Sequence, residues 1–220
     1  MDLKQEANCL LPKITRLTAS KIKDSQDQLN QISWHKGESN TDLEFSELAK
    51  EKCIESFNEI NTNKNLSLEV KVPDLLLIFK KGNVRENFKI ELKSTKSNDG
   101  SVPGSMIMTL DPNMWTIFCL RKNDEFHIRY GRYYLGMSRG SHDLFQDRSP
   151  RPRLQFENYQ NIAEEPILKE TTVDKSFYKY YAKSAVNRVL NPKGRGSWQD
   201  DLVKEIIRIV ITDQEKFKDI

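Results

Sequence analysis

The apolar residues of the first 62 positions recur with helical spacing, and two helices are expected there. The first is expected to begin near Pro12, because proline favours the first turn of a helix. The second is expected after Thr41, since Thr41 followed by Glu44 has the form of a capping box. Its glutamates make a stripe that is typical of a solvated face, and Glu44 and Glu55 border the apolar side, where either could reach a functional site.

From residue 66 the apolar positions alternate with polar ones, which predicts β-strands. Residues 66–72 form the first expected strand. The runs DLLLIFKK and ENFKIELK form two more, joined by a tight hairpin turn at Gly82 and Asn83. Two further strands are expected in residues 115–136, joined at Asn123 and Asp124, and helices are expected over 177–190 and 198–211. The fold class is therefore α+β (mixed α/β), with a mixed central sheet flanked by helices.

The hairpin turn sets the register of its two strands, because side chains alternate between the faces of a sheet. This register places Asp74 directly opposite Glu91, and it leaves the facing apolar side chains on the other surface. Leu76 and Ile78 share the face of Asp74, which favours a strand that is buried on both sides. The apolar pairs are Leu75 with Ile90 and Leu77 with Phe88.

Composition restricts the class of protein. The chain has 220 residues, of which 37% are hydrophobic and 30% charged, and it contains no apolar run of the roughly 20 residues that span a bilayer. No membrane partner is expected. The N-terminus lacks the pattern of a secretory signal, so a cytoplasmic location is expected. The three cysteines, Cys9, Cys53 and Cys119, are far apart and are interpreted as reduced thiols rather than as a disulfide framework or a zinc site.

The net charge of +3 is small, but arginine is distributed unevenly. Residues 121–153 hold 7 of the 12 arginines, with 8 basic against 4 acidic side chains, whereas residues 1–70 hold 9 basic and 12 acidic ones. The arginine fork suits phosphates and guanine edges, so this segment indicates nucleic acid. A solvated surface loop is an equally good interpretation.

Asp74 and Glu91 suggest a metal site. Opposed residues in a hairpin have Cβ atoms about 5 Å apart, so two carboxylates there repel each other unless a cation or a proton lies between them. Their oxygens are ligands that Mg²⁺ prefers. Lys93 lies two residues after Glu91, on the same face, where an ammonium can reach a bound water or phosphate. The alternative is an exposed hairpin with scattered charges.

The residues Pro73-Asp74 and Glu91-Leu92-Lys93 resemble the Pro-Asp…(Asp/Glu)-x-Lys motif of the PD-(D/E)xK nuclease superfamily. They fall on two consecutive expected strands, after an acidic helix and before another strand pair, as that fold requires. The segment 91–110 is similar to the one that follows the catalytic lysine in type II restriction endonucleases of the EcoRV-like branch. The resemblance covers roughly residues 72–120. Glu91 stands where that branch often has aspartate.

The resemblance implies a restriction-endonuclease-like fold and Mg²⁺-dependent hydrolysis of phosphodiester bonds in double-stranded DNA. The implied catalytic residues are Asp74, Glu91 and Lys93. Asp74, Glu91 and the carbonyl of Leu92 would hold the metal, and Lys93 would act on the attacking water and the phosphate. A single domain, 1–220, is expected, with a helical region over 1–62, a catalytic core over about 63–135 and a DNA-contacting helical elaboration over 136–220.

Each chain has one candidate site and a duplex has two strands, so a homodimer is expected. Most direct DNA contacts are expected from the segment after Lys93 and from the arginine-rich segment. The basic loop near residue 193 is either a further DNA contact or a plain linker between two helices. Two alternatives remain open: another nuclease of this fold, such as a junction resolvase or a repair or transposition nuclease, and a noncatalytic DNA-binding protein. The expected DNA-contacting residues are Ser94, Thr95, Lys96, Asn98, Arg129, Arg132, Arg139, Arg148, Arg151, Arg153, Lys193 and Arg195.

Overall fold

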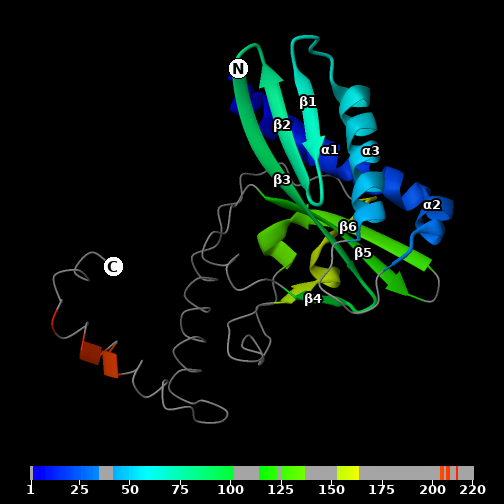
Figure 1. Cartoon of the computed structure of the whole chain (residues 1–220), viewed down its shortest axis with the longest axis vertical. Helices are drawn as coiled ribbons and strands as arrows, with labels where there is room; N and C mark the ends of the chain where they lie inside the picture. Colours follow the sequence, from blue (N-terminus) through cyan, green and yellow to red (C-terminus); the bar gives the residue numbers. More distant parts are fainter. Residues whose placement is uncertain are drawn as a thin grey trace.

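The computed structural model describes residues 2–34, 42–101, 114–122, 125–136 and 153–163, together with helical residues 204, 205, 207, 208 and 212. Within them the chain forms a mixed six-stranded sheet with α-helices packed against it (Figure 1). The expected fold class, α+β, is confirmed. None of the helices in the described ranges is both long and apolar enough to cross a membrane.

The N-terminal helices are α1 (Leu3–Asp24), α2 (Gln26–Gln31) and α3 (Leu43–Ile60). The prediction that the first helix begins near Pro12 is wrong. Asp2 caps α1 by accepting a hydrogen bond from the backbone N–H of Gln5 at 2.7 Å, and the buried stripe already begins at Leu3. Pro12 lies buried in the helix interior, so the apolar stripe and the cap, rather than the proline, determine where this helix starts.

The start of α3 also differs from the prediction. Asp42, not Thr41, is the N-cap residue, and Thr41 lies outside the described residues. Glu44 does not complete a capping box, because its Oε2 accepts a hydrogen bond from the backbone N–H of Ser33 at 2.8 Å. The Asp42 side chain accepts a hydrogen bond from the hydroxyl of Ser94, so the start of α3 is tied to the central sheet.

The large sheet has the strand order β1-β2-β3-β5-β6-β8, in which only β3 and β5 are parallel. The predicted hairpin register is confirmed, with Leu75 opposite Ile90 and Leu77 opposite Phe88. Gly82 has φ +60°, the left-handed conformation that a tight turn requires and that glycine adopts without strain. The strands are β1 (Ser67–Lys71), β2 (Leu75–Lys81), β3 (Val84–Thr95), β5 (Trp115–Lys122), β6 (Glu125–Arg132) and β8 (Gln160–Asn161).

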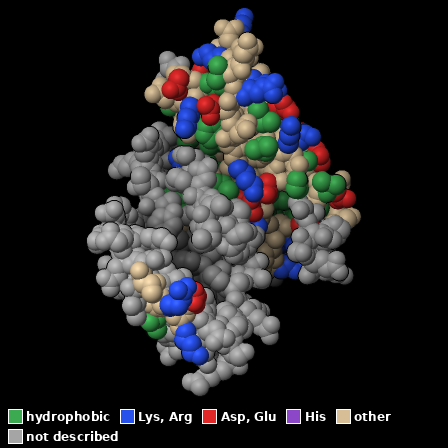
Figure 2. All heavy atoms as spheres, turned by 60° about the vertical axis from the view of Figure 1, so that its left-hand side comes forward, with side chains coloured by type: hydrophobic (Ala, Val, Ile, Leu, Met, Phe, Trp, Pro, Cys, Tyr) green, Lys and Arg blue, Asp and Glu red, His purple; other side chains and the backbone are tan. Residues whose placement is uncertain are grey.

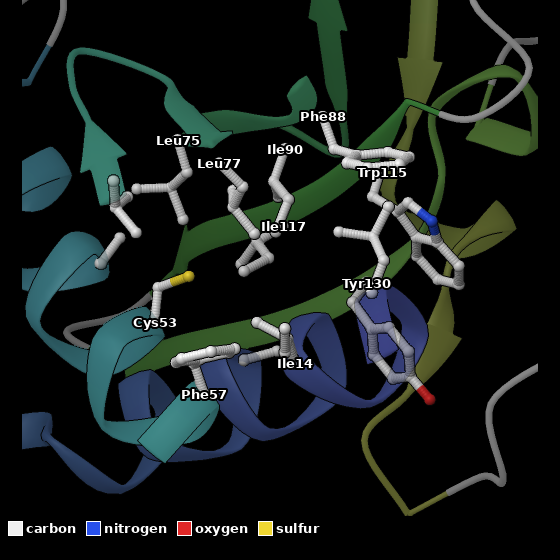
Figure 3. Packing of buried hydrophobic residues seen from close by; sticks show 14 of the residues in the cluster. Ile14, Cys53, Phe57, Leu75, Leu77, Phe88, Ile90, Trp115, Ile117 and Tyr130 are labelled. Carbon is white, nitrogen blue, oxygen red and sulfur yellow. The ribbon is translucent and has the colours of Figure 1, made fainter. Parts of the chain in front are cut away.

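The main hydrophobic core lies between one face of this sheet and the helices α1 and α3. Leu77, Ile90 and Ile117 point from the strands toward the helices, where Ile14 of α1 and Phe57 of α3 meet them (Figure 3). All of these side chains are buried. Burial of this kind stabilises the fold by about 25 cal/mol for each Å² of apolar surface removed from water. Because the apolar side chains of β3 face the helices, the polar side chains that alternate with them lie on the opposite face of the sheet.

A second cluster covers the opposite face, near β5 and β6. It includes residues of two 3₁₀-helices, η1 (Tyr133–Gly136) and η2 (Phe156–Asn158), and of β7 (Arg153–Gln155), which pairs with β4 (Asp99–Ser101) in a small antiparallel sheet. This cluster borders the polar side chains of β3, so part of that face is enclosed. Its members are Met114, Phe118, Leu120, Tyr133, Leu154, Phe156 and Tyr159.

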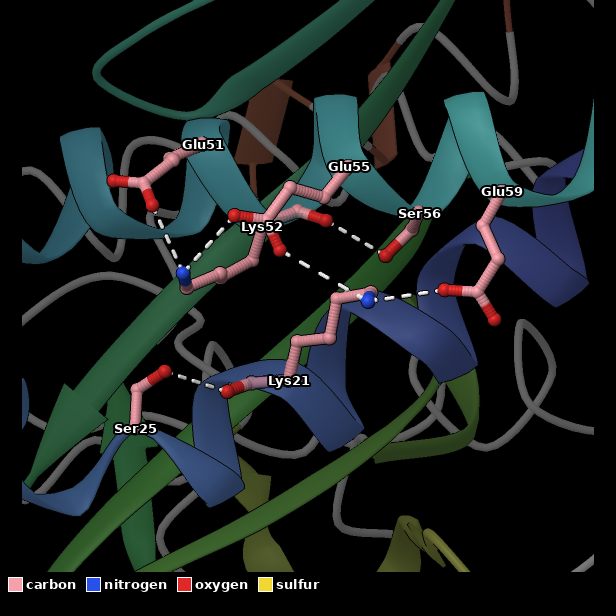
Figure 4. Close-up of polar contacts among 7 residues, drawn as sticks. All are labelled: Lys21, Ser25, Glu51, Lys52, Glu55, Ser56 and Glu59. Carbon is pink, nitrogen blue, oxygen red and sulfur yellow. Dashed lines mark hydrogen bonds and ion pairs between the residues drawn. The ribbon is translucent and has the colours of Figure 1, made fainter.

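Ion pairs connect the outer sides of α1 and α3 (Figure 4). Lys21 Nζ lies 3.9 Å from Glu55 Oε2 and 3.0 Å from Glu59 Oε2, and Lys52 Nζ lies 3.1 Å from Glu55 Oε1. These glutamates are exposed, and such pairs contribute at most about 1 kcal/mol each. The glutamate stripe is thus a solvated face, and Glu55 is engaged in it.

The three cysteines are free thiols, as expected from the sequence: Cys9 is exposed, while Cys53 and Cys119 are buried. Burial raises the pKa of each of the two buried thiols to about 12, so both stay protonated at neutral pH. Toward the C-terminus, the helix expected over 198–211 agrees with the helical conformation of residues 204, 205, 207 and 208, and the helix expected over 177–190 lies outside the described residues.

Candidate functional site

Three of the sequence-predicted residues meet at one end of the β2–β3 hairpin. Glu91 and Lys93 are on β3 and project from the same face. Asp74 is in the turn between β1 and β2, one position beyond the last pair of the ladder, Leu75 with Ile90. Asp74 Oδ1 accepts a hydrogen bond from the backbone N–H of Leu92 at 3.1 Å, and this bond holds the carboxylate beside β3.

Ion pairs connect the two carboxylates. Lys89 Nζ lies 2.9 Å from Asp74 Oδ2 and 2.8 Å from Glu91 Oε2, so one ammonium touches both acidic residues. Lys93 Nζ lies 2.7 Å from the other oxygen of Glu91. The predicted juxtaposition of Asp74, Glu91 and Lys93 is therefore present. Lys89, which sequence analysis did not single out, belongs to the same group.

Glu91 is the most buried member of this group, at 5% exposure. Burial alone raises the pKa of a carboxyl group, but Lys93 and then Lys89 outweigh burial and hold the pKa of Glu91 below its ordinary value. Burial lowers the pKa of Lys89, and Glu91 and Asp74 reverse that effect and raise it. At neutral pH, Glu91 is a carboxylate and Lys89 an ammonium.

Several buried polar atoms on this face have no hydrogen bond within the described residues. They include the hydroxyls of Thr116 and Tyr133. Thr116 is paired with Glu91 across the parallel strands β3 and β5. Burial and then the negative charge of Glu91 raise the pKa of Tyr133, which keeps its hydroxyl protonated. Unpaired buried polar groups are costly, so these two hydroxyls need a partner beyond the described contacts, such as bound water.

Tyr159 lies beside this polar region. It is buried and donates a hydrogen bond from its hydroxyl to the backbone oxygen of Tyr133 at 3.2 Å. The Thr116 hydroxyl partly offsets the rise that burial causes in the Tyr159 pKa, although Thr116 and Tyr159 do not form a hydrogen bond of ordinary geometry. Sequence analysis missed Thr116, because β5 is buried on both faces and has no alternating pattern to show which side chains share the face of Glu91. It missed Tyr133 and Tyr159 because they lie in and after short 3₁₀-helices, which have no periodic pattern.

The residues present fit a hard divalent cation such as Mg²⁺. Asp74 and Glu91 supply carboxylate oxygens. In an extended strand the N–H and C=O of one residue point to the same side. Because the Leu92 N–H faces Asp74, the Leu92 carbonyl faces it too. No group of three or more His, Cys, Asp or Glu within the described ranges is arranged to hold a metal, so water and a phosphate would complete the shell of a cation bound here.

The face of β2 that carries Asp74 is more open than expected. Leu76 is 37% exposed and Ile78 is only partly buried, so the prediction that this strand is buried on both faces is wrong. The acidic helix lies on the other face of the sheet, against Ile90. Glu44 and Glu55, each with partners of its own there, do not join Asp74 and Glu91.

The residues after Lys93 have different environments. Ser94 donates its hydroxyl hydrogen bond to Asp42, on the helix side of the sheet. Thr95 Oγ1 accepts a hydrogen bond from the backbone N–H of Ser97 at 3.1 Å. Lys96 and Asn98 are exposed. Of these four predicted DNA contacts, Lys96 and Asn98 have the side chains that are most accessible to a ligand.

Two arginines of the predicted DNA-contacting set pack within the fold. The Arg129 guanidinium lies 4.8 Å from the ring centroid of Phe156 and 3.1 Å from a carboxylate oxygen of Glu157. The Arg132 guanidinium lies 4.6 Å from the ring centroid of Trp115. Arg153 is in β7, and the remaining members of the set lie outside the described residues: Arg139, Arg148, Arg151, Lys193 and Arg195.

The described residues visible in Figure 2 form no large patch of a single charge sign. On the described part of the face in Figure 2, Lys and Arg side chains are interspersed with Asp and Glu. No protein-family model, no curated protein and no solved structure matches this chain.

Proposed function

We propose that this protein is a Mg²⁺-dependent endonuclease of the PD-(D/E)xK type that hydrolyses phosphodiester bonds in double-stranded DNA. The observation that carries the proposal is the convergence of Asp74, Glu91 and Lys93 on one face of the β2–β3 hairpin, with ion pairs at 2.7 to 2.9 Å connecting the group. A solvated hairpin has no need of a carboxylate that is 5% exposed and whose two oxygens are each held by a lysine ammonium.

The order of the elements supports a restriction-endonuclease-like fold. The acidic helix α3 precedes the strands β2 and β3 that carry the three residues, and the strand pair β5 and β6 follows. β3, which bears Glu91 and Lys93, is central, with β2 antiparallel on one side and β5 parallel on the other. A central strand is a rigid support, and a catalytic group needs its position fixed closely.

Each residue has a chemical part in the proposed reaction. Asp74, Glu91 and the Leu92 carbonyl would hold Mg²⁺, which when bound polarises a phosphate oxygen and activates water. Lys93, whose ammonium is 2.7 Å from Glu91, would orient the attacking water and stabilise negative charge that develops on the phosphate. Although burial raises it, the charges of Lys93 and Lys89 hold the pKa of Glu91 below its ordinary value, so this ligand is ionised at neutral pH before a metal binds.

We propose a type II restriction enzyme, acting as a homodimer, as the specific form of this activity. The described residues hold one such site, and cutting both strands of a duplex needs two. Exposed Lys96 and Asn98, directly after the strand that bears Lys93, lie where they would meet DNA next to the scissile phosphate.

Purified protein is expected to cut supercoiled plasmids into discrete fragments with Mg²⁺ and to leave them intact with EDTA. Plasmids of several sequences should be compared by gel electrophoresis at several salt concentrations. A Glu91→Gln variant purified in parallel controls for contaminating nucleases. Plasmids that stay unchanged under all of these conditions would contradict the proposal, cleavage of branched DNA alone would indicate a resolvase, and binding without cleavage would indicate a noncatalytic DNA-binding protein.

A further inference from the structure

Lys89 holds the place where the carboxylates would bind a metal. Its Nζ is 2.9 Å from Asp74 Oδ2 and 2.8 Å from Glu91 Oε2. A divalent cation held by the same two oxygens would lie closer to them, at about 2.0 to 2.6 Å depending on the ion. An ammonium and a metal cannot occupy this position together, so one must leave before the other binds.

The position of Lys89 on β3 makes this exchange possible. Lys89, Glu91 and Lys93 alternate along one face of the strand, and the Lys89 side chain is 36% exposed. Leu76 is its cross-strand partner and is also exposed, so the aliphatic part of Lys89 can rest on Leu76 while the ammonium turns outward. Lys93 contacts the other oxygen of Glu91 and does not touch Asp74 in the described contacts.

We propose that the Lys89 ammonium competes with the divalent cation for Asp74 and Glu91. In the free protein Lys89 bridges the two carboxylates, and it is expelled when the metal binds. This inference rests on the proposed metal site and adds the way in which that site is regulated. While Lys89 bridges the carboxylates, it stabilises their negative charges and closes the site to metal. The apparent metal affinity is then the intrinsic affinity multiplied by the fraction of molecules in which the site is open. Expulsion also frees the Lys89 ammonium at the edge of the site, where it can donate hydrogen bonds to a DNA phosphate. Metal and DNA binding are thereby linked.

The test measures Ca²⁺ binding to the full chain without DNA by isothermal titration calorimetry. Lys89→Met keeps the apolar stem and removes the charge. It is expected to bind Ca²⁺ about 10-fold more tightly than the wild type, the gain expected if the site is open in about a tenth of wild-type molecules. Lys89→Arg keeps a competing cation and should bind within about 3-fold of the wild type. Asp74→Asn should lose most of the binding, because it removes a ligand charge.

Lys80→Met is the matched control. Lys80 is on the neighbouring strand β2, is 31% exposed and is paired with Glu69 away from the site, so its removal should leave the Ca²⁺ affinity unchanged. Circular dichroism in EDTA checks that each variant is folded. If Lys89→Met does not fold without metal, Lys89→Gln replaces it, because glutamine removes the charge and can still donate hydrogen bonds to the carboxylates.

The outcomes separate this inference from the proposed function. If the wild type binds Ca²⁺, Asp74→Asn does not, and neither uncharged Lys89 variant binds more tightly than the wild type, Lys89 is no competitor and the metal site stands. If neither the wild type nor the uncharged Lys89 variants bind Ca²⁺ at millimolar concentration, both proposals are overturned. A tightening of the same size in Lys80→Met would show a general charge effect and would also overturn the inference.

Discussion

Asp74→Asn is expected to lower the rate of DNA cleavage by about 1000-fold or more while the protein stays folded. Asparagine keeps the size of the side chain and an oxygen that can accept the hydrogen bond from the Leu92 N–H. It removes one of the two carboxylate charges that would hold Mg²⁺, and the loss of a single group that stabilises a transition state costs about 100- to 1000-fold. Loss of the metal adds to that cost.

Lys93→Ala is expected to have an effect of similar size and to retain DNA binding, because in the proposed mechanism Lys93 would act on the reacting phosphate, and it is not part of the hydrophobic core. Single-turnover cleavage of plasmid, with binding measured separately in Ca²⁺, distinguishes the two effects. Glu69→Gln is the control, since Glu69 is a carboxylate paired with Lys80 on the same sheet but outside the site. Full activity in either Asp74→Asn or Lys93→Ala would show that the site is assigned to the wrong residues.

Phe79→Ala is expected to lower the free energy of unfolding by about 3 to 5 kcal/mol, the usual cost of truncating a buried aromatic side chain. Phe79 is fully buried on β2. Its ring centroid lies 6.1 Å from that of Phe57 on α3 and 5.7 Å from that of Phe88 on β3, edge-to-face in both cases. The substitution would leave a cavity where the hairpin that supports the site meets the helices.

Urea denaturation, followed by circular dichroism, measures this loss. Val84→Ala is the matched control, because Val84 begins the other strand of the same hairpin and is 55% exposed, so it should change the unfolding free energy by no more than about 0.5 kcal/mol. A loss below about 1 kcal/mol for Phe79→Ala would contradict the packing described between the hairpin and α3.

The hairpin was predictable from sequence because local signals agreed there. A glycine in the turn and strict alternation in β3 specify a single register, and this register brings Asp74 close to Glu91. The first helix was harder, since Pro12 has the form of a start signal, whereas the cap at Asp2 and the buried stripe from Leu3 determine the start. A single residue that favours a helix start does not outweigh the N-cap and the packing of the whole helix.

The partners of the charged residues could not be predicted. Lys89 bridges two carboxylates because the turn before β2 places Asp74 within its reach. The residue pattern does not encode the geometry of that turn, so the bridge could not be predicted. The prediction that Arg129 and Arg132 contact DNA rests on the local density of arginine and stays a prediction. The packing of their guanidinium groups over Phe156 and Trp115 could not be read from that density. Contacts of this kind depend on which strands pair, and Phe156 is far from Arg129 in sequence.

The most direct test of the metal-dependent site is anomalous diffraction from crystals of the wild-type protein grown with Mn²⁺, which takes the same oxygen ligands as Mg²⁺. We expect an anomalous peak at coordination distance from a carboxylate oxygen of Asp74 and of Glu91, with the Lys89 ammonium displaced from between them. An Mn²⁺ ion bound at other residues, with Lys89 still bridging Asp74 and Glu91, would contradict the account.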